Sequence, residues 1–259
     1  ITNMNEIAIY PSLKDKVVLV TGGASGIGEN IVKQFVLQKS KVAFLDINEN
    51  LGENLTNHIK NKYGVESLFV KCDLKNIDSL KSSLNTVKDK IGPISILINN
   101  AANDERHDFD SVTPEYWDDR MNINLKHYFF ATQYVYKDMK KIGKGSVVNI
   151  GSFSWMISQG GMPGYTTAKS AIMGLTRSLA RELGIYNIRV NSIVPGWIIT
   201  ERQKKLWLTP EIEKTFLQRQ CIKRMLVPED ISKPVLFFAS DQSSGCTAQN
   251  YVIDGGIVN

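Results

Sequence analysis

The sequence predicts an α/β protein in which a parallel, doubly wound sheet of about seven strands is covered by helices on both faces. Two observations predict this fold. Short apolar runs alternate with longer segments of helical periodicity along nearly the whole chain. No linker, internal repeat or low-complexity tract interrupts this alternation. A length of 259 residues suits one large domain with a sizeable core, so we expect residues 1–259 to form a single domain.

Seven apolar runs supply the predicted strands. Each run is short, rich in β-branched residues and bounded by turn residues, as expected for strands that are buried on both faces. In chain order they are residues 17–21, 42–46, 67–71, 94–98, 146–150, 188–194 and 251–254.

Segments with apolar residues at steps of three and four predict the covering helices. The clearest of them includes residue 165 and ends at Gly184, which we expect to act as a C-terminal stop. Its apolar face comprises Ala168, Ile172, Leu175, Leu179 and Leu183. The other predicted helices follow Gly28 and cover about residues 49–63, 114–141 and 228–240.

Composition and charge argue against several other classes of protein. The formal net charge is +5 and the basic residues are scattered, with small clusters at residues 137–144 and 202–205, so no nucleic-acid partner is expected. No apolar run approaches a membrane span and no signal peptide is visible, which predicts a cytoplasmic protein without a membrane partner. The three cysteines form no CxxC pair and the three histidines have no metal-ligand spacing, so we expect reduced thiols and no metal.

A glycine-rich turn after the first strand predicts a dinucleotide site. Thr21 is followed by GGASGIG, in which Gly22, Gly26 and Gly28 would let the backbone turn tightly and approach a pyrophosphate. The helix that begins there offers free N–H groups and the positive end of its dipole. The preceding strand and the following amphipathic helix provide the context that a Rossmann-type site requires.

The end of the second predicted strand favours NAD as the cofactor. Asp46 lies 18 residues after Gly28, near the roughly 20 expected for a carboxylate that binds the adenosine ribose. This carboxylate would repel a 2′-phosphate, and no Arg or Lys stands at positions 24, 25, 47 or 48 to receive one. We therefore expect NAD rather than NADP.

Three polar side chains are predicted to meet at the carboxyl edge of the sheet. Tyr165 and Lys169 stand four residues apart on one helix face, and Ser152 follows the strand at residues 146–150. A nearby Lys charge favours the phenolate and lowers the pKa of a tyrosine, so the phenol can exchange a proton while the serine holds a substrate oxygen. Taken alone, a Tyr-x-x-x-Lys pattern more often marks a helix with one exposed Tyr and one exposed Lys.

Together, these motifs resemble the short-chain dehydrogenase/reductase family, and the resemblance covers nearly all of the chain. Residues 21–28 match the cofactor motif of the family, residues 99–101 match its Asn-Asn-Ala motif, and Pro195-Gly196 match its nicotinamide-side motif. Ala102 stands where the family usually has Gly, and its methyl group is tolerable if the backbone φ angle is negative.

The resemblance extends to the catalytic tetrad of the family, at Asn124, Ser152, Tyr165 and Lys169. It implies that Tyr165 takes the proton from the substrate hydroxyl and that Ser152 hydrogen-bonds the reacting oxygen. Lys169 would lower the pKa of Tyr165 and hold the nicotinamide ribose, and Asn124 would support a water that links Lys169 to solvent.

The cofactor-binding residues implied by the resemblance lie at the carboxyl ends of the strands. Asp73, for example, would meet the adenine amine. The full set is Gly22, Ser25, Gly26, Ile27, Gly28, Asp46, Asp73, Leu74, Asn100, Ala101, Tyr165, Lys169, Pro195, Gly196, Ile198 and Thr200.

Stretches outside these motifs look like the bacterial NAD-dependent aldose 1-dehydrogenases of the D-xylose/L-arabinose type. They are residues 8–16, 103–107, 116–127, 151–155 and 200–211. The resemblance implies that the anomeric hydroxyl of a free pentose or related sugar is oxidised to the aldonolactone, with hydride transfer to NAD. Analogy with relatives further implies a homotetramer.

Candidate substrate contacts follow the fourth and sixth predicted strands. Polar residues beside an aromatic side chain suit a sugar, which offers many hydroxyls and one apolar ring face. The candidates are Asn103, Asp104, Ser152, Ser154, Tyr165, Trp197 and Gln203, with Arg106 and His107 as further candidates in the same loop. Residues 197–226 are long and irregular, which predicts a lid on the substrate side, whereas residues 1–15 are a polar N-terminal lead.

Two alternatives remain at this level. One is an NADPH-dependent short-chain reductase that acts on a non-sugar ketone or a hydroxyacyl substrate, and Asp46 argues against it. The other is an NAD-binding regulator or scaffold without catalysis, and the intact tetrad argues against it.

Overall fold

Seven parallel strands form one sheet in the computed structural model of the chain, which describes residues 7–258. The strands are β1 (Val17–Thr21), β2 (Lys41–Asp46), β3 (Leu68–Lys71), β4 (Ile96–Asn99), β5 (Gly145–Ile150), β6 (Ile188–Pro195) and β7 (Asn250–Ile253). Their order across the sheet is β3-β2-β1-β4-β5-β6-β7. The strand order reverses between β1 and β4, and ligands bind at this kind of switch point in open α/β sheets. The predicted Rossmann-type fold is confirmed.

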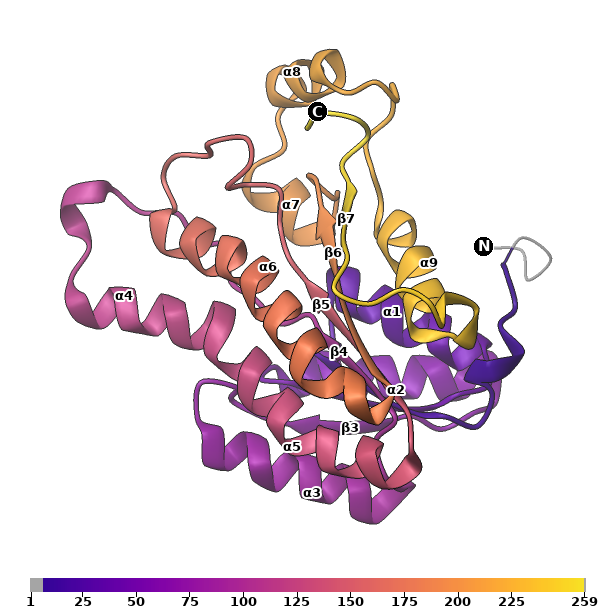
Figure 1. Cartoon of the computed structure of the whole chain (residues 1–259). Helices are drawn as coiled ribbons and strands as arrows, with labels where there is room; N and C mark the ends of the chain where they lie inside the picture. Colours follow the sequence, from indigo (N-terminus) through magenta and orange to yellow (C-terminus); the bar gives the residue numbers. More distant parts are fainter. Residues whose placement is uncertain (1–6, 259) are drawn as a thin grey trace.

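Helices cover both faces of this sheet (Figure 1). One face carries α1 (Gly26–Leu37), α2 (Glu49–Tyr63) and α9 (Pro228–Ala239). The other carries α3 (Ile77–Ile91), α5 (His127–Ile142) and α6 (Pro163–Leu183). Two short helices, α7 (Glu201–Leu206) and α8 (Pro210–Arg219), follow β6, and α8 lies beyond the sheet at the top of Figure 1. No helix among residues 7–258 is both long and apolar enough to cross a membrane.

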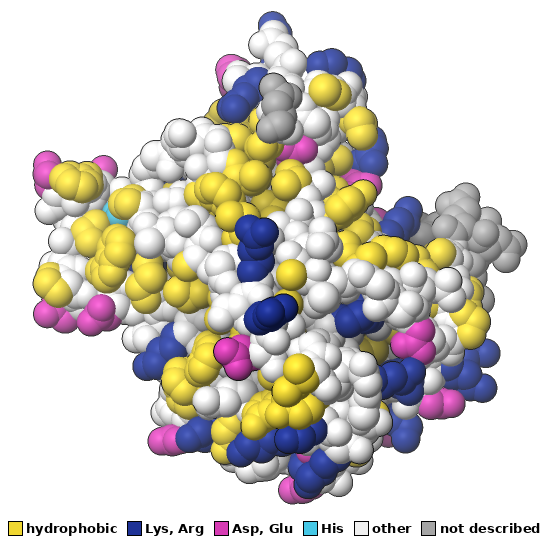
Figure 2. Space-filling view, viewed as in Figure 1, with side chains coloured by type: hydrophobic (Ala, Val, Ile, Leu, Met, Phe, Trp, Pro, Cys, Tyr) yellow, Lys and Arg dark blue, Asp and Glu magenta, His cyan; other side chains and the backbone are white. Residues whose placement is uncertain are grey.

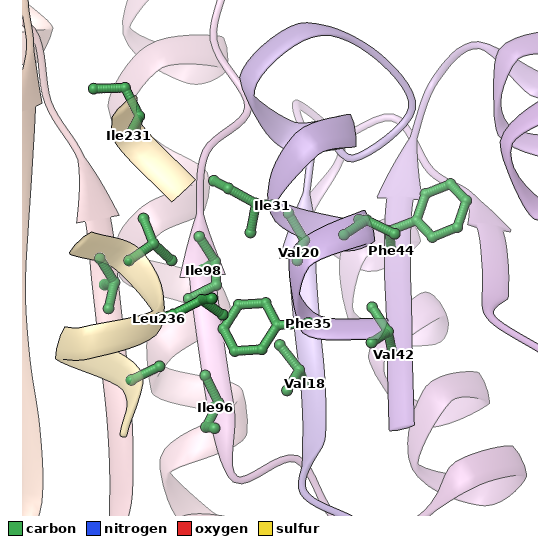
Figure 3. Close-up of a cluster of buried hydrophobic side chains, with 14 of the residues drawn as sticks. Val18, Val20, Ile31, Phe35, Val42, Phe44, Ile96, Ile98, Ile231 and Leu236 are labelled. Carbon is green, nitrogen blue, oxygen red and sulfur yellow. The ribbon is translucent and has the colours of Figure 1, made fainter. Parts of the chain in front are cut away.

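Alternate residues of β1 point into two separate cores, because successive side chains of a strand face opposite ways. Val18 and Val20 pack with Phe35 of α1 and with α9, as Figure 3 shows. Leu19 packs into the core under α3, α5 and α6. Both faces of the strand are therefore buried, which explains why its sequence is continuously apolar instead of alternating.

The predicted helix at residues 114–141 is interrupted in the structure. Helix α4 (Pro114–Met121) passes through a π-helical turn (Asn122–Lys126) before it continues as α5. One wide turn hardly disturbs the apolar spacing on either side, so the periodicity gave no sign of it. Such turns are rare and occur frequently at functional sites.

Other differences from the sequence prediction are small. Most strand ends shift by one or two residues, and β4 begins at Ile96 instead of residue 94. Gly184 caps α6 but has a φ angle of −58°, and a short 3₁₀ turn follows it before Asn187 takes the left-handed conformation at 57°. In the predicted N-terminal lead, Leu13 is fully buried against the sheet, and residues 1–6 lie outside the described residues.

Candidate active site

A cleft of about 1300 Å³ runs along the carboxyl ends of the strands. All sixteen predicted cofactor-binding residues line it. So do three of the four catalytic candidates and every substrate candidate except His107. Predicted site residues as far apart in the sequence as Gly22 and Gln203, 181 positions, therefore meet in one cleft.

The glycine-rich turn leaves room for a dinucleotide because its glycines have no side chains. Its backbone geometry also requires glycine. Gly22 and Gly26 have φ angles of +64° and +58°, and a Cβ on Gly22 would lie 2.7 Å from the Cα of Ala101. Asn100 holds the turn from below, since its amide nitrogen donates to the carbonyls of Thr21 at 3.0 Å and Gly22 at 2.9 Å. The N-terminus of α1 opens directly above, and this geometry fits a pyrophosphate.

Ala102 also lies in the cleft, where its family would usually place glycine. Its φ angle is outside the left-handed region, so the methyl group causes no backbone strain.

The carboxylate of Asp46 is fixed at the mouth of the cleft by two backbone amides. One oxygen accepts from the N–H of Ala24 and the other from the N–H of Asn48, both at 3.0 Å. Each oxygen keeps further acceptor capacity for a ribose hydroxyl. Lys33 of α1 lines the same cleft, but it forms an ion pair with Glu29. Asp46 therefore presents a fixed carboxylate to the cleft.

Ser152, Tyr165 and Lys169 meet near the middle of the cleft. The first two turns of α6 place Tyr165 and Lys169 on one face, with the lysine nitrogen 5.7 Å from the centre of the tyrosine ring. Ser152 follows β5, and its hydroxyl donates to the Ser154 hydroxyl at 3.1 Å. The three groups that the sequence predicted at one edge are thus close together.

Lys169 is held by a residue that the sequence analysis missed. Its ammonium donates to the carbonyl of Ile150 at 2.8 Å and to the hydroxyl of Tyr128 at 3.0 Å. Tyr128 lies on α5, directly after the π-helical turn, and is fully buried. In the sequence, Tyr128 reads as one more aromatic core residue of an amphipathic helix, so the periodicity carried no signal of this contact.

The expected lowering of the Tyr165 pKa is not found. Burial raises the pKa of this phenol well above its usual range, the negative charge of Asp104 adds to the rise, and the Ser152 hydroxyl opposes it. Burial also lowers the pKa of Lys169 to about 7, although Asp104 favours its charged form. Lys169 is buried, and Tyr165 is partly buried. The lysine directs two N–H groups at Tyr128 and Ile150, so its charge does not lower the pKa of Tyr165 and the effect of burial prevails.

Asn124 does not line the cleft, in contrast to the other three residues of the tetrad. It is fully buried in the π-helical turn, where its oxygen accepts from the backbone N–H of Asn103 at 2.8 Å. Its amide nitrogen donates back to the carbonyl of Asn103 at 3.2 Å. Asn124 therefore fixes the loop after β4, and its contact with Lys169 through water stays a prediction.

His107 is not a cleft residue, which corrects the sequence prediction. Its ring packs against the ring of Tyr116 at 5.0 Å, and its backbone N–H donates to the carbonyl of Gly161 at 2.8 Å. The loop after β4 turns outward at this point, so only its first residues face the cleft. Arg106, the preceding residue, does line it, and its guanidinium lies 4.1 Å from the ring centre of Trp207.

A chain of hydrogen bonds links the predicted substrate contacts in the cleft. The indole N–H of Trp197 donates to the Gln203 oxygen at 2.7 Å, and the Gln203 nitrogen donates to Asp104 at 2.8 Å. Arg202 approaches the other oxygen of Asp104 at 3.3 Å. These side chains hold one another in place, and they join the loop after β4 to α7.

One face of Trp197 is already in contact with protein. Phe216 of α8 packs against it with ring centres 4.6 Å apart. Figure 2 shows hydrophobic side chains gathered on the surface just beneath α8. An aromatic pair from α8 and from the segment between β6 and α7 thus forms an apolar wall of the cleft.

This combination of sheet, glycine-rich turn and Ser-Tyr-Lys cluster defines a nicotinamide-dependent oxidoreductase of the Rossmann class. A family model described as "Enoyl-(Acyl carrier protein) reductase" matches residues 22–258. The chain belongs to the short-chain dehydrogenase/reductase family.

Individual relatives are similar over nearly their whole length. The chain is 44% identical over 248 residues to a probable galactose dehydrogenase, GalD, of Rhizobium meliloti. The aligned region covers 96% of this chain and 97% of the relative. The chain is 45% identical over 249 residues to the D-xylose 1-dehydrogenase of Caulobacter vibrioides, at 96% and 98% coverage. A solved short-chain type dehydrogenase/reductase from Mycobacterium ulcerans superposes with a TM-score of 0.90 at 26% identity, covering 95% and 91% of the two chains.

Proposed function

We propose that the protein oxidises the anomeric hydroxyl of a free aldose to the aldonolactone, with NAD as the hydride acceptor. The observation that carries the substrate class is the hydrogen-bonded chain of Asp104, Gln203 and Trp197 beside Ser152 and Tyr165. Their carboxylate and amide oxygens can accept more than one hydrogen bond, so a substrate with many hydroxyls gains contacts here that an analogue without them lacks. The similarity to two sugar dehydrogenases supports the same substrate class.

The side chains at the centre of the cleft have separate tasks in this proposal. Tyr165, once it has released its own proton and become a phenolate, takes the proton of the anomeric hydroxyl, and Ser152 donates to the same oxygen as it becomes a carbonyl. Lys169 stabilises the negative charge on the phenolate and binds the nicotinamide ribose with its remaining N–H. Bound NAD would supply the hydride acceptor and a positively charged ring near the phenol.

The choice of NAD over NADP rests on Asp46. Replacing Asp46 with Ala removes the ribose acceptor and the charge that repels a 2′-phosphate, so NAD use should fall and relative NADP use should rise. The kcat/KM values of both cofactors with one sugar measure this shift. Asp73→Ala, at the adenine end of the cleft, serves as a control because it should weaken both cofactors alike. A wild-type enzyme that prefers NADP would contradict the proposal.

The main alternative is a reductase of ketones or hydroxyacyl thioesters. The decisive assay follows NADH production over a panel of pentoses, hexoses, deoxyhexoses, simple alcohols and hydroxyacyl thioesters. We expect a free aldose to give the highest kcat/KM. If a thioester or hydroxysteroid ranks first and no aldose reacts, the sugar proposal fails. Protein that binds NAD but turns over nothing would instead favour the regulatory alternative.

We also infer that α7 and α8 form a lid, that the chain is one functional domain and that it assembles as a homotetramer in the cytoplasm. The lid is supported by the contacts of α7 with the loop after β4, from Asp104 to Arg202 and from Arg106 to Trp207. Sedimentation equilibrium measures the mass of the assembly in solution, and a monomer would contradict the proposed homotetramer.

A further inference from the structure

The ammonium of Lys169 lies in a closed set of three hydrogen bonds. It donates to the Ile150 carbonyl at 2.8 Å and to the Tyr128 hydroxyl at 3.0 Å. The Tyr128 hydroxyl in turn donates to the same Ile150 carbonyl at 3.0 Å. Because a lysine has three N–H donors, two of them are used here and one is left for the cleft.

Tyr128 is well suited to hold this arrangement. Its side chain is fully buried on α5, and its ring lies 5.2 Å from the lysine nitrogen, so the ring and the hydroxyl both favour the cation. The hydroxyl donates to Ile150, which leaves its lone pairs to accept from Lys169. A phenylalanine would keep the ring and remove only the acceptor.

We infer that Tyr128 is a positioning residue for the reaction, because its hydroxyl fixes the Lys169 ammonium beside Tyr165 and keeps the lysine charged during turnover. The inference rests on the proposed function for its kinetic consequence. Its structural consequence, the protonation of Lys169, is independent of the substrate.

The charged and titratable groups around Lys169 determine at which pH it loses its proton. Burial lowers the pKa of His127 to about 3, so this neighbour on α5 is neutral and adds no repulsion at neutral pH. Burial raises the pKa of both Tyr128 and Tyr165 well above the usual range, which keeps them neutral in the resting protein. Asp104 is the negative group that favours the ammonium. Because Asp104 is the only negative charge that favours the ammonium among these groups, the hydrogen bond to the Tyr128 oxygen is important for keeping Lys169 protonated.

The test is Tyr128→Phe, compared with Tyr136→Phe two turns further along α5 at the edge of the core. Loss of the acceptor should lower kcat about tenfold or more while the KM for the sugar changes less than about threefold. The alkaline limb of the rate profile, where Lys169 loses its proton, should move to lower pH by about one unit. Tyr136→Phe should leave all three unchanged.

A second measurement does not depend on the substrate. Titration of ¹³Cε-labelled lysine by NMR, with the Lys169 signal assigned from Lys169→Met, should show a lower pKa in Tyr128→Phe than in the wild type. If no aldose is oxidised, the proposed function fails while this titration still decides the role of Tyr128. An unchanged titration overturns the inference, whatever happens to kcat. Tyr128→Met, which fills a similar volume, replaces the Phe variant if that variant does not fold.

Discussion

At the scale of single residues, the site depends on how deeply its polar groups are buried. Lys169 is only 2% exposed, yet it carries a cationic group, and burial opposes that charge. Tyr165 is likewise held in its neutral form. The chemistry therefore needs specific partners for each charge, which is why the contacts of Lys169 matter more than its distance from Tyr165.

The first prediction concerns the proton acceptor. Tyr165→Phe should lower kcat by about three orders of magnitude or more, because the ring stays and only the acidic hydroxyl is removed. Binding of NAD, measured by calorimetry, should change little. Near-normal turnover in this variant would exclude Tyr165 from the mechanism.

The second prediction concerns the buried lysine and protein stability. The folded-state pKa of Lys169 is about 7, below that of an unfolded lysine near 10.4, so the unfolded chain binds more protons between these values. Stability should therefore rise with pH across this window, with a contribution from Lys169 of at most about 1.4 kcal/mol per pH unit. Below pH 7 the full penalty of the buried charge is present.

The free energy of unfolding is measured by chemical denaturation between pH 6.5 and pH 10, for the wild type and for Lys169→Met. The variant should lose the part of the slope that comes from Lys169. Lys214→Met, on the surface of α8, is the control and should keep the wild-type slope. Equal slopes in Lys169→Met and the wild type would show that the lysine stays charged throughout.

At the scale of elements, the loop after β4 and the helix α7 behave as one unit. Asp104 accepts from Arg202 and Gln203, and Arg106 stacks on Trp207 at the end of the same helix. The N-terminus of α7 is fixed as well, since the Thr200 hydroxyl accepts from the N–H of Gln203. These contacts span the mouth of the substrate side and favour a closed arrangement.

The third prediction concerns a variant that weakens these contacts. Arg202→Met removes a partly exposed ion pair worth about 0.2–1 kcal/mol, so the KM for the sugar should rise about two- to fivefold with little change in kcat. Hydrogen exchange of the α7 amides should speed up as well. Lys204→Met is the matched control, because Lys204 pairs only with Glu201 of its own helix among the described residues. If the two variants behave alike, Arg202 does not hold the lid.

At the scale of the whole molecule, two cores on opposite faces of the sheet hold the carboxyl edge in place. Phe35 of α1 is fully buried in one of them, in the core that α1 and α9 form with the sheet. Figure 3 shows its ring directed at the strands. Because α1 begins at the glycine-rich turn, packing of its far end also stabilises the position of that turn.

The fourth prediction tests this core. Phe35→Ala should lower the free energy of unfolding by about 3–5 kcal/mol, since it deletes a large buried side chain and leaves a cavity. Denaturant titration measures the loss. Ile185→Ala, at a side chain that is 77% exposed, should change stability by less than about 0.5 kcal/mol. A loss below 1 kcal/mol at Phe35 would mean that the core closes around the cavity.

The sequence by itself determined the class of fold and the groups at the cleft. Continuous apolar runs and 3.6-residue periodicity are local signals, and they located all seven strands within a few residues. The glycine-rich turn and Asp46 could be placed for the same reason, because parallel strands bring their carboxyl ends to one edge whatever the details of packing. The outward turn at His107 and the burial of Asn124 could not be read from spacing.

Only the tertiary structure decided which groups touch. Tyr128 reaches Lys169 across 41 residues of sequence, and Asp104 reaches Arg202 across 98. Such pairs depend on how helices cross the sheet and on one π-helical turn, none of which leaves a mark in local periodicity. The same packing buries Lys169 and partly buries Tyr165. It lowers the pKa of Lys169 and raises the pKa of Tyr165, and the rise is opposite to the direction that the sequence predicted. Desolvation is a property of the whole fold, and a pattern of residue types does not contain it.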